Sequence, residues 1–294
     1  MITELAILQF SLMFLFALAC MAALLIIFFQ THPLTIYRNQ PSLACLLLAN
    51  FASAAVILPF SVIWILFCLR IIDTDVKNEA ILVISGTVAQ SLSIVYDCVT
   101  IGVFLQRNYY LAFPLRCTKQ ADRVVGCMVA VCSVVAVVLV TSSNVSSLGF
   151  QTELQHDCFS FNCILLPNTI ARICNLSFKC VGSVVNVILG VAFLIVLKRS
   201  KVWFNSAMDN KVNRFLMYIF ILRCVFETAP FYVDLFSTLI LRVNIGLYIG
   251  AYGAQEWALD ICCTSISYYL LLVKKPRESS KIFQSTPQNI PISH

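Results

Sequence analysis

Charged residues are scarce in this sequence: 12% of its 294 residues are Asp, Glu, Lys or Arg, whereas soluble domains usually have about 25%. Apolar residues, with Cys and the aromatics included, make up 60%. So few charges cannot cover so much apolar surface in water, which excludes a water-soluble enzyme or binding module. The same numbers exclude a disordered chain, because disorder requires low hydrophobicity and high charge. The composition favours one membrane-embedded bundle.

Histidine is scarcer still, with three residues that all lie outside the long apolar runs: His32, His156 and His294. A serine–histidine dyad or a histidine-ligated zinc site within those runs is therefore excluded. Asp97 follows a tyrosine, as in one half of the aspartyl intramembrane protease pair. The residues before Asp260 are Trp-Ala-Leu, however, and not the Gly-x-Gly of the other half. We expect no enzymatic activity and no cofactor.

The 20 Lys and Arg residues gather in short clusters between the apolar runs. A nucleic-acid-binding protein would instead spread its basic residues along an exposed groove, interleaved with aromatics. Short clusters are typical of loops held against an anionic leaflet. We therefore expect the lipid bilayer as a partner and no nucleic acid.

Long apolar runs are what the sequence has in abundance. The hydrocarbon core of a bilayer is roughly 30 Å thick, so a spanning helix needs about 20 largely apolar residues. Seven runs qualify, at residues 5–29, 43–69, 80–105, 124–148, 175–197, 215–241 and 245–273. The sequence therefore predicts an all-α membrane protein, with a seven-transmembrane helix bundle over residues 1–273 and a tail over residues 274–294.

The distribution of Lys and Arg predicts the orientation of the bundle. One set of alternate loops and the tail hold fourteen of these residues, and the opposite set of loops holds five. Because cytoplasmic loops carry the excess of positive charge, the N-terminus is expected outside and the tail in the cytoplasm.

Ionisable side chains inside the last two runs matter most for mechanism. Each costs on the order of 2.5–3.5 kcal/mol at mid-bilayer, so it usually faces the bundle interior and has a partner. Helical spacing puts one set on a single face of the sixth run: Arg223, Glu227, Pro230 and Asp234. Steps of four residues put another set on one face of the seventh run: Tyr248, Tyr252, Glu256 and Asp260.

Asp97 of the third run completes a predicted polar layer. At 1.5 Å per residue along each helix, Asp97, Arg223 and Asp260 lie at similar depth, and Glu227 and Glu256 lie near the centre. We hypothesise that Arg223 pairs with Asp97 or Asp260 across helices and changes partner on activation. A static ion pair that only fixes helix orientation is the alternative. One arginine cannot neutralise four acids, so we expect some of these carboxyls to be neutral.

The outer halves of the helices are expected to enclose a ligand cavity. A mostly apolar pocket with a few polar groups suits a small organic ligand. The candidate lining residues come from the third, sixth and seventh runs: Gln90, Phe231, Asp234, Tyr248 and Tyr252. Packing in the bundle or in the interfacial aromatic belt is the alternative role for the aromatic residues. We also expect Pro230 to kink the sixth helix.

The longest outer loop and its flanks hold an even set of cysteines: Cys158, Cys163, Cys174 and Cys180. On the oxidising side of a membrane such a set indicates disulfides, with three possible pairings. His156 with Cys158 and Cys163 fits no standard zinc spacing, so no metal is predicted. Asn144 and Asn175 begin glycosylation sequons, both close to the membrane.

The end of the third run reads Gln106-Arg107-Asn108, and Pro114-Leu115 follow seven residues after the arginine. This segment resembles the Asp/Glu-Arg-Tyr triplet and following Pro-Leu of serpentine G-protein-coupled receptors, with Gln and Asn in place of the acid and the tyrosine. The resemblance implies that Arg107 helps to hold the inactive state and is released toward the G protein on activation. It also implies that Pro114 and Leu115 lie in the coupling loop. An ordinary positive-inside arginine at a helix end is the alternative.

A second, weaker similarity lies in the second run, where Leu48-Ala49-Asn50 with Pro59 resembles the Leu-Ala-x-x-Asp…Pro pattern of these receptors. Asn50 stands in the acidic place and joins the predicted polar layer. With its short N-terminal segment and eroded motifs, the chain is similar to the divergent nematode chemoreceptors. The resemblance implies a small-molecule ligand, a heterotrimeric G protein as partner, a plasma-membrane location and a sensory cilium as the setting.

A proton- or cation-coupled transporter or channel is the rival class, because four carboxyls lie within the spans: Asp97, Glu227, Glu256 and Asp260. Transporters typically show repeated halves with helices broken at matching positions. Pro59 and Pro230 do not correspond in this way, and seven spans do not halve. The sequence therefore favours the receptor.

Overall fold

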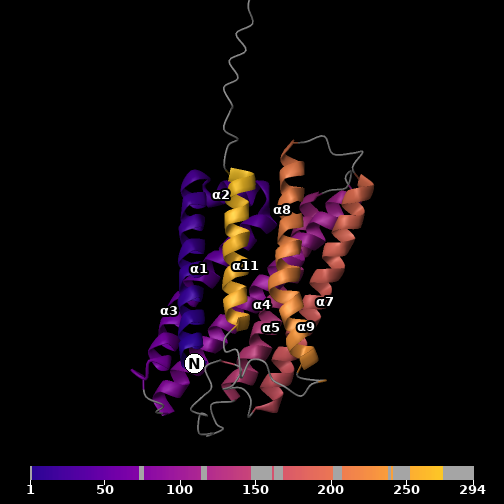
Figure 1. Cartoon of the computed structure of the whole chain (residues 1–294). Coiled ribbons are helices and arrows are strands. Elements are labelled where there is room, and N and C mark those ends of the chain that lie inside the picture. Colours follow the sequence, from indigo (N-terminus) through magenta and orange to yellow (C-terminus); the bar gives the residue numbers. More distant parts are fainter. Residues whose placement is uncertain are drawn as a thin grey trace, which may run out of the picture.

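The computed structural model describes residues 2–72, 76–113, 118–146, 161, 168–200, 207–237, 240 and 252–273. Within these ranges the backbone is almost entirely helical and contains no strand. The helices stand side by side in one elongated bundle (Figure 1). The predicted all-α class is therefore confirmed.

Seven helical stretches are long and apolar enough to cross a membrane: Thr3–Gln30, Pro41–Cys68, Ala80–Ala112, Gln120–Val145, Thr169–Arg199, Asn210–Phe236 and Tyr252–Val273. Each overlaps one of the seven predicted runs. The third and fifth are longer than predicted, because polar residues at their ends continue the same helices. These findings support a multi-pass membrane protein.

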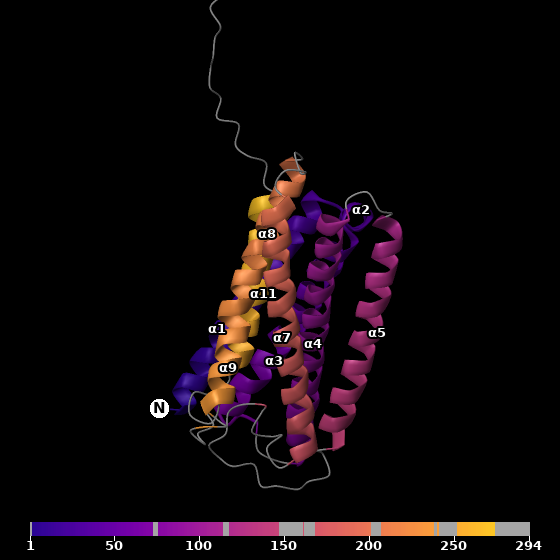
Figure 2. The same cartoon turned by 90° about the vertical axis from the view of Figure 1, so that its right-hand side faces the viewer.

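Five of the spans belong to single long helices: α1 (Ile2–Gln30), α3 (Pro41–Cys68), α4 (Val76–Ala112), α5 (Thr118–Val145) and α7 (Thr169–Ser200). Helix α4 packs against α3, α5 and α7, and α1 packs against α3 and α11 (Tyr252–Tyr268). Figure 2 shows α5 at the edge of the bundle. Successive spans alternate in direction, so α1 begins at the end of the bundle opposite to that where the seventh span finishes (Figure 1).

A short helix, α2 (Pro33–Asn39), joins the first two spans. Pro33 occupies its first turn, where the missing proline N–H costs nothing. The Nδ1 atom of His32 accepts a hydrogen bond from the backbone N–H of Leu34 at 3.3 Å and caps the helix. The apolar Ile36 of α2 is buried against α3, so α2 is folded onto the ends of its neighbours.

The sixth span is not one regular helix. It consists of α8 (Ala207–Arg223), a π-helical turn η2 (Cys224–Thr228) and α9 (Ala229–Phe236). The backbone N–H of Ala229 donates to the carbonyl of Cys224, five residues earlier. Pro230 has no N–H and its ring displaces the carbonyl four residues before it, which favours this wider turn. Pro230, which was predicted to kink the sixth helix, lies just after this π-helical turn at the start of α9, and such turns recur at functional sites.

Large aromatic side chains fill the spaces between the helices. Phe10 of α1 stacks on Trp64 of α3 with ring centroids 5.4 Å apart. Phe104 of α4 contacts Phe193 of α7 and Phe220 of α8, with centroids 6.0 and 6.3 Å apart. These contacts join α4, α7 and α8 to one another.

The ring of Phe220 lies against the backbone of α7 at Gly190, where an added Cβ would overlap the ring. We expect Gly190→Ala to lower the thermal stability of the detergent-solubilised protein, because overpacking costs about 1–3 kcal/mol. Gly126→Ala is the matched control, since nothing lies within 4 Å of its added Cβ and alanine is the better helix former. Melting temperatures by fluorescence-detected size-exclusion chromatography compare the two. Equal melting temperatures would contradict the contact.

Candidate functional site

A cluster of buried charges lies between three of the helices. Arg223, at the end of α8, is 2% exposed. Its Nη2 atom pairs with Asp97 of α4 and with Glu227, one turn further along the sixth span. Its Nη1 atom lies 3.2 Å from Oδ2 of Asp260 of α11. One guanidinium thus joins carboxylates from α4, the sixth span and α11, and we call these four side chains the ion cluster.

Tyr96 lines one side of the ion cluster. Its ring centroid lies 4.7 Å from the guanidinium carbon of Arg223, within the range of a cation–π interaction. Its hydroxyl donates a hydrogen bond to Oδ2 of Asp260 at 3.0 Å. Tyr96 is fully buried, so both contacts are made away from solvent, where electrostatic interactions are strong.

Two atoms of the ion cluster find no hydrogen-bond partner among the described residues: Nε of Arg223 and Oδ1 of Asp260. Three carboxylates also compete for the two terminal nitrogens of one guanidinium. Arg223 therefore has acceptors available on two neighbouring helices, and its pairing with either can strengthen as the other weakens. This property suits a switch between two helix arrangements.

The structure brings together four of the six residues predicted for the polar layer. Among the described residues, Arg223 pairs with Asp97, Glu227 and Asp260 and not with Glu256, whose electrostatic partner is Lys179 of α7. The sequence predicted that Arg223 pairs with Asp97 or with Asp260, and in the structure Arg223 contacts both.

Asn50, the sixth residue of the predicted layer, lies in a separate polar group. Its Nδ2 atom donates to Oγ of Ser265 at 3.1 Å. The Ser265 hydroxyl in turn lies 3.4 Å from Sγ of Cys20. This group connects α3, α11 and α1 and does not touch Arg223.

Arg107 connects α4 to α8. Its Nε atom donates to Oδ1 of Asn213 at 2.8 Å. Gln106 and Tyr110, its neighbours on α4, both hydrogen-bond to Asp122 of α5. Other residues of the predicted coupling segment, Pro114 and Leu115, lie outside the described residues.

Two of the predicted ligand-pocket residues face each other across the sixth and seventh spans. Asp234 of α9 and Tyr252 of α11 are within interaction distance of each other. Phe231 is half-buried, and its ring packs edge-on against Tyr232 with centroids 5.4 Å apart. Tyr248 lies outside the described residues.

Gln90 is held by a chain of amides that also corrects the glycosylation prediction. Nδ2 of Asn175 donates to Oδ1 of Asn144 at 3.0 Å, and Nδ2 of Asn144 donates to Oε1 of Gln90 at 2.8 Å. Both asparagines are buried. A glycan on either nitrogen would break these bonds and has no room inside the bundle, so the structure does not support the two predicted sites.

The predicted disulfides fall partly outside the described residues. Cys158 and Cys163 are not described. Cys174 and Cys180 both have free thiols, and they stand six positions apart on α7. The structure therefore forms no disulfide at these two predicted positions.

Three contacting residues were not predicted: Tyr96 at the ion cluster, Asn213 at Arg107 and Asp122 at Gln106 and Tyr110. Tyr96 adjoins Asp97 in sequence, but neighbouring residues of a helix do not share a face. Asn213 and Asp122 stand near helix ends among other polar residues, and nothing in the local pattern distinguishes them.

Comparison with known proteins identifies no family. No protein-family model matches the chain, and no curated protein matches it significantly.

Arg223→Gln is expected to destabilise the protein strongly, because it leaves the buried Asp97 and Asp260 and the half-buried Glu227 without their counter-charge. Breaking a buried ion pair by removing one partner costs about 3–5 kcal/mol. The matched control is Arg70→Gln, since Arg70 is exposed at the end of the second span. Melting temperatures in detergent test the expectation, and equal losses in the two variants would show that the ion cluster contributes nothing.

Two substitutions of Tyr96 separate its contacts. Tyr96→Phe removes the hydrogen bond to Asp260 and is expected to cost about 1.5–3 kcal/mol, as for other bonds to charged groups. Tyr96→Leu removes the ring over Arg223 as well and should cost more. Tyr218→Phe, at an exposed tyrosine of α8, serves as the control. If Tyr96→Phe and Tyr96→Leu had the same melting temperature, the ring would have no stabilising contact with the guanidinium.

Proposed function

We propose that this protein is a G-protein-coupled chemosensory receptor, related to the divergent nematode serpentine receptors. In this proposal the N-terminus lies outside the cell and residues 274–294 lie in the cytoplasm. The receptor detects a small organic molecule between the outer halves of its helices and signals to a heterotrimeric G protein at the plasma membrane.

The observation that carries the proposal is the ion cluster. Arg223 lies where α8 passes into the π-helical turn, and it contacts carboxylates on α4 and on α11. A ligand that displaced α9 or α11 would alter the balance between these contacts. Because buried charges cannot be left unpaired, a change of partner would carry α8 with it.

A second tie between α4 and α8 supports this mechanism. Arg107 lies ten residues beyond Asp97 on α4, and Asn213 lies ten residues before Arg223 on α8. Both intervals correspond to about 15 Å of helix. The two helices are therefore joined twice, once at the ion cluster and once at Arg107–Asn213, toward the proposed cytoplasmic end. Motion of α8 at the first tie would be transmitted to the second, where the receptor resemblance puts the G protein.

The alternative function is a transporter or channel that moves protons or cations. It is favoured by the excess of carboxylates around one guanidinium. Those carboxylates lie in a cluster that also holds three helices together, which favours a switch over a conduction path.

The experiment is expression of the full chain with a promiscuous G protein, followed by a panel of small volatile and water-soluble compounds. We expect an active compound to evoke a second-messenger response that survives ion substitution and disappears in Arg107→Ala. An ion current that persists without a G protein would reverse the order of the two proposals.

Asn213→Ala tests the tie between α4 and α8 without a known ligand. The variant loses the hydrogen bond from Arg107, worth about 1.5–3 kcal/mol for a charged donor. If this bond holds the inactive arrangement, basal signalling should rise at least about tenfold. Asn210→Ala, at an exposed position of the same helix, should leave basal signalling unchanged. Unchanged basal signalling in both variants, at equal surface expression, would refute a restraining role for Asn213.

A further inference from the structure

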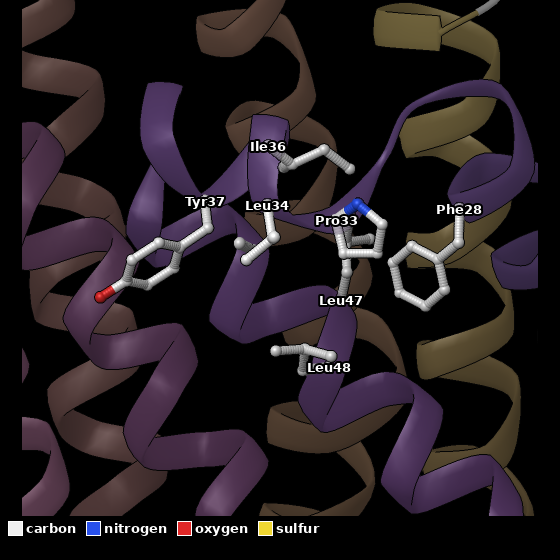
Figure 3. Close-up of a pocket in the computed structure, with 8 residues that line it drawn as sticks. Phe28, Pro33, Leu34, Ile36, Tyr37, Leu47 and Leu48 are labelled. Carbon is white, nitrogen blue, oxygen red and sulfur yellow. The ribbon is translucent and has the colours of Figure 1, made fainter.

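A cavity of about 270 Å³ opens at the end of the bundle where α1, α2 and α3 meet. Its lining consists of apolar side chains and one tyrosine: Phe28, Pro33, Leu34, Ile36, Tyr37, Ala44, Leu47 and Leu48. In Figure 3 the labelled side chains come from the end of α1, from α2 and from the early turns of α3, and the ring of Phe28 lies beside Pro33. None of them belongs to the ion cluster or to the predicted ligand site.

The cavity has a buried floor and an exposed rim. Ile36, Ala44 and Leu47 form the floor and are almost fully buried. Leu34 and Leu48, on the rim, are 67% and 52% exposed. The cavity is therefore open to the surroundings of the bundle, and an occupant can enter it from outside without unfolding the protein.

The position of the cavity indicates what surrounds it. The first apolar span ends at Gln30 and the second begins at Pro41, and the lining residues lie on both sides of this boundary. This is the level at which lipid hydrocarbon gives way to headgroups. A polar solute would leave its hydrogen-bonding groups unpaired against a carbon lining, which is costly. A hydrocarbon chain has no hydrogen-bonding groups and can occupy the cavity without this cost.

The segments that line the cavity carry no negative side chain. Arg38 is exposed and directly follows the rim residue Tyr37. The sequence has no Asp or Glu from Leu5 to Ile72. The helix α2 and the adjoining ends of α1 and α3 therefore have no carboxylate that would repel an anionic ligand. A basic residue beside the membrane attracts anionic lipid, and a guanidinium suits a phosphate in particular.

We propose that this cavity binds one acyl chain of an anionic phospholipid, with Arg38 holding the phosphate and the apolar lining holding the chain. The site is independent of the proposed receptor activity, because it shares no residue with that mechanism. A lipid bound there would link the first two spans to the leaflet that surrounds α2.

The test uses the full chain in phosphatidylcholine nanodiscs that contain a minor fraction of phosphatidylserine with a photoreactive acyl chain. Peptide mass spectrometry locates the crosslinks, and a phosphatidylcholine probe with the same chain serves for comparison. We expect the phosphatidylserine probe to label the segment from Phe28 to Leu48 in preference to the phosphatidylcholine probe. Arg38→Gln should lower this preference about fivefold, as for the loss of one basic residue near an anionic surface.

Leu48→Trp and Val62→Trp complete the test. Both positions are exposed on α3, but only Leu48 lines the cavity, so only Leu48→Trp should block its mouth and reduce labelling of the segment several-fold. If the two probes labelled the segment equally, or if Leu48→Trp behaved like Val62→Trp, the contact would be that of ordinary surrounding lipid. Either result would overturn the proposal.

Discussion

The buried guanidinium of Arg223 is the constraint on which the packing of the helices depends. A charge with 2% exposure is tolerated only if opposite charges lie within reach. Asp97 and Asp260 supply these charges from α4 and α11, so the depth and rotation of both helices are set relative to α8. Apolar packing alone would not choose among such arrangements, because helices in lipid gain little from burying one apolar surface instead of another.

The surrounding structure is adapted to this constraint. The backbone of α7 passes beside the ion cluster at Gly182, where an added Cβ would lie 3.9 Å from Oδ2 of Asp97. Tyr96 covers the guanidinium with its ring and bonds Asp260 with its hydroxyl. The π-helical turn begins at the residue after Arg223, so the backbone departs from α-helical geometry where the side chain is most tightly held. The tightly held side chain of Arg223 and the irregular turn η2 thus lie next to each other on the sixth span.

Much of this could be predicted from the sequence. Hydropathy defines all seven spans, because a run of about 20 apolar residues has few alternatives. The common depth of Asp97, Arg223 and Asp260 follows from the helical rise alone. Helix rotation is not determined in this way, and the remaining differences follow from it. Asn144 and Asn175 match a local surface motif, yet both face the bundle interior. Glu256 shares a face with Asp260 by spacing, and still Arg223 pairs with Asp260 and not with Glu256.

The π-helical turn η2 has a consequence for the outer part of the sixth span. A π-turn accommodates one more residue than an α-helical turn, and each residue of an α-helix turns it by about 100°. If the extra residue were absorbed into regular helix, α9 would rotate by roughly that angle while α8 stayed in place. Phe231 and Asp234 would then face different neighbours, although Arg223 and its partners on α4 and α11 had not moved. The π-helical turn η2 is therefore a point at which the outer half of the sixth span, α9, can rotate separately from the inner half, α8.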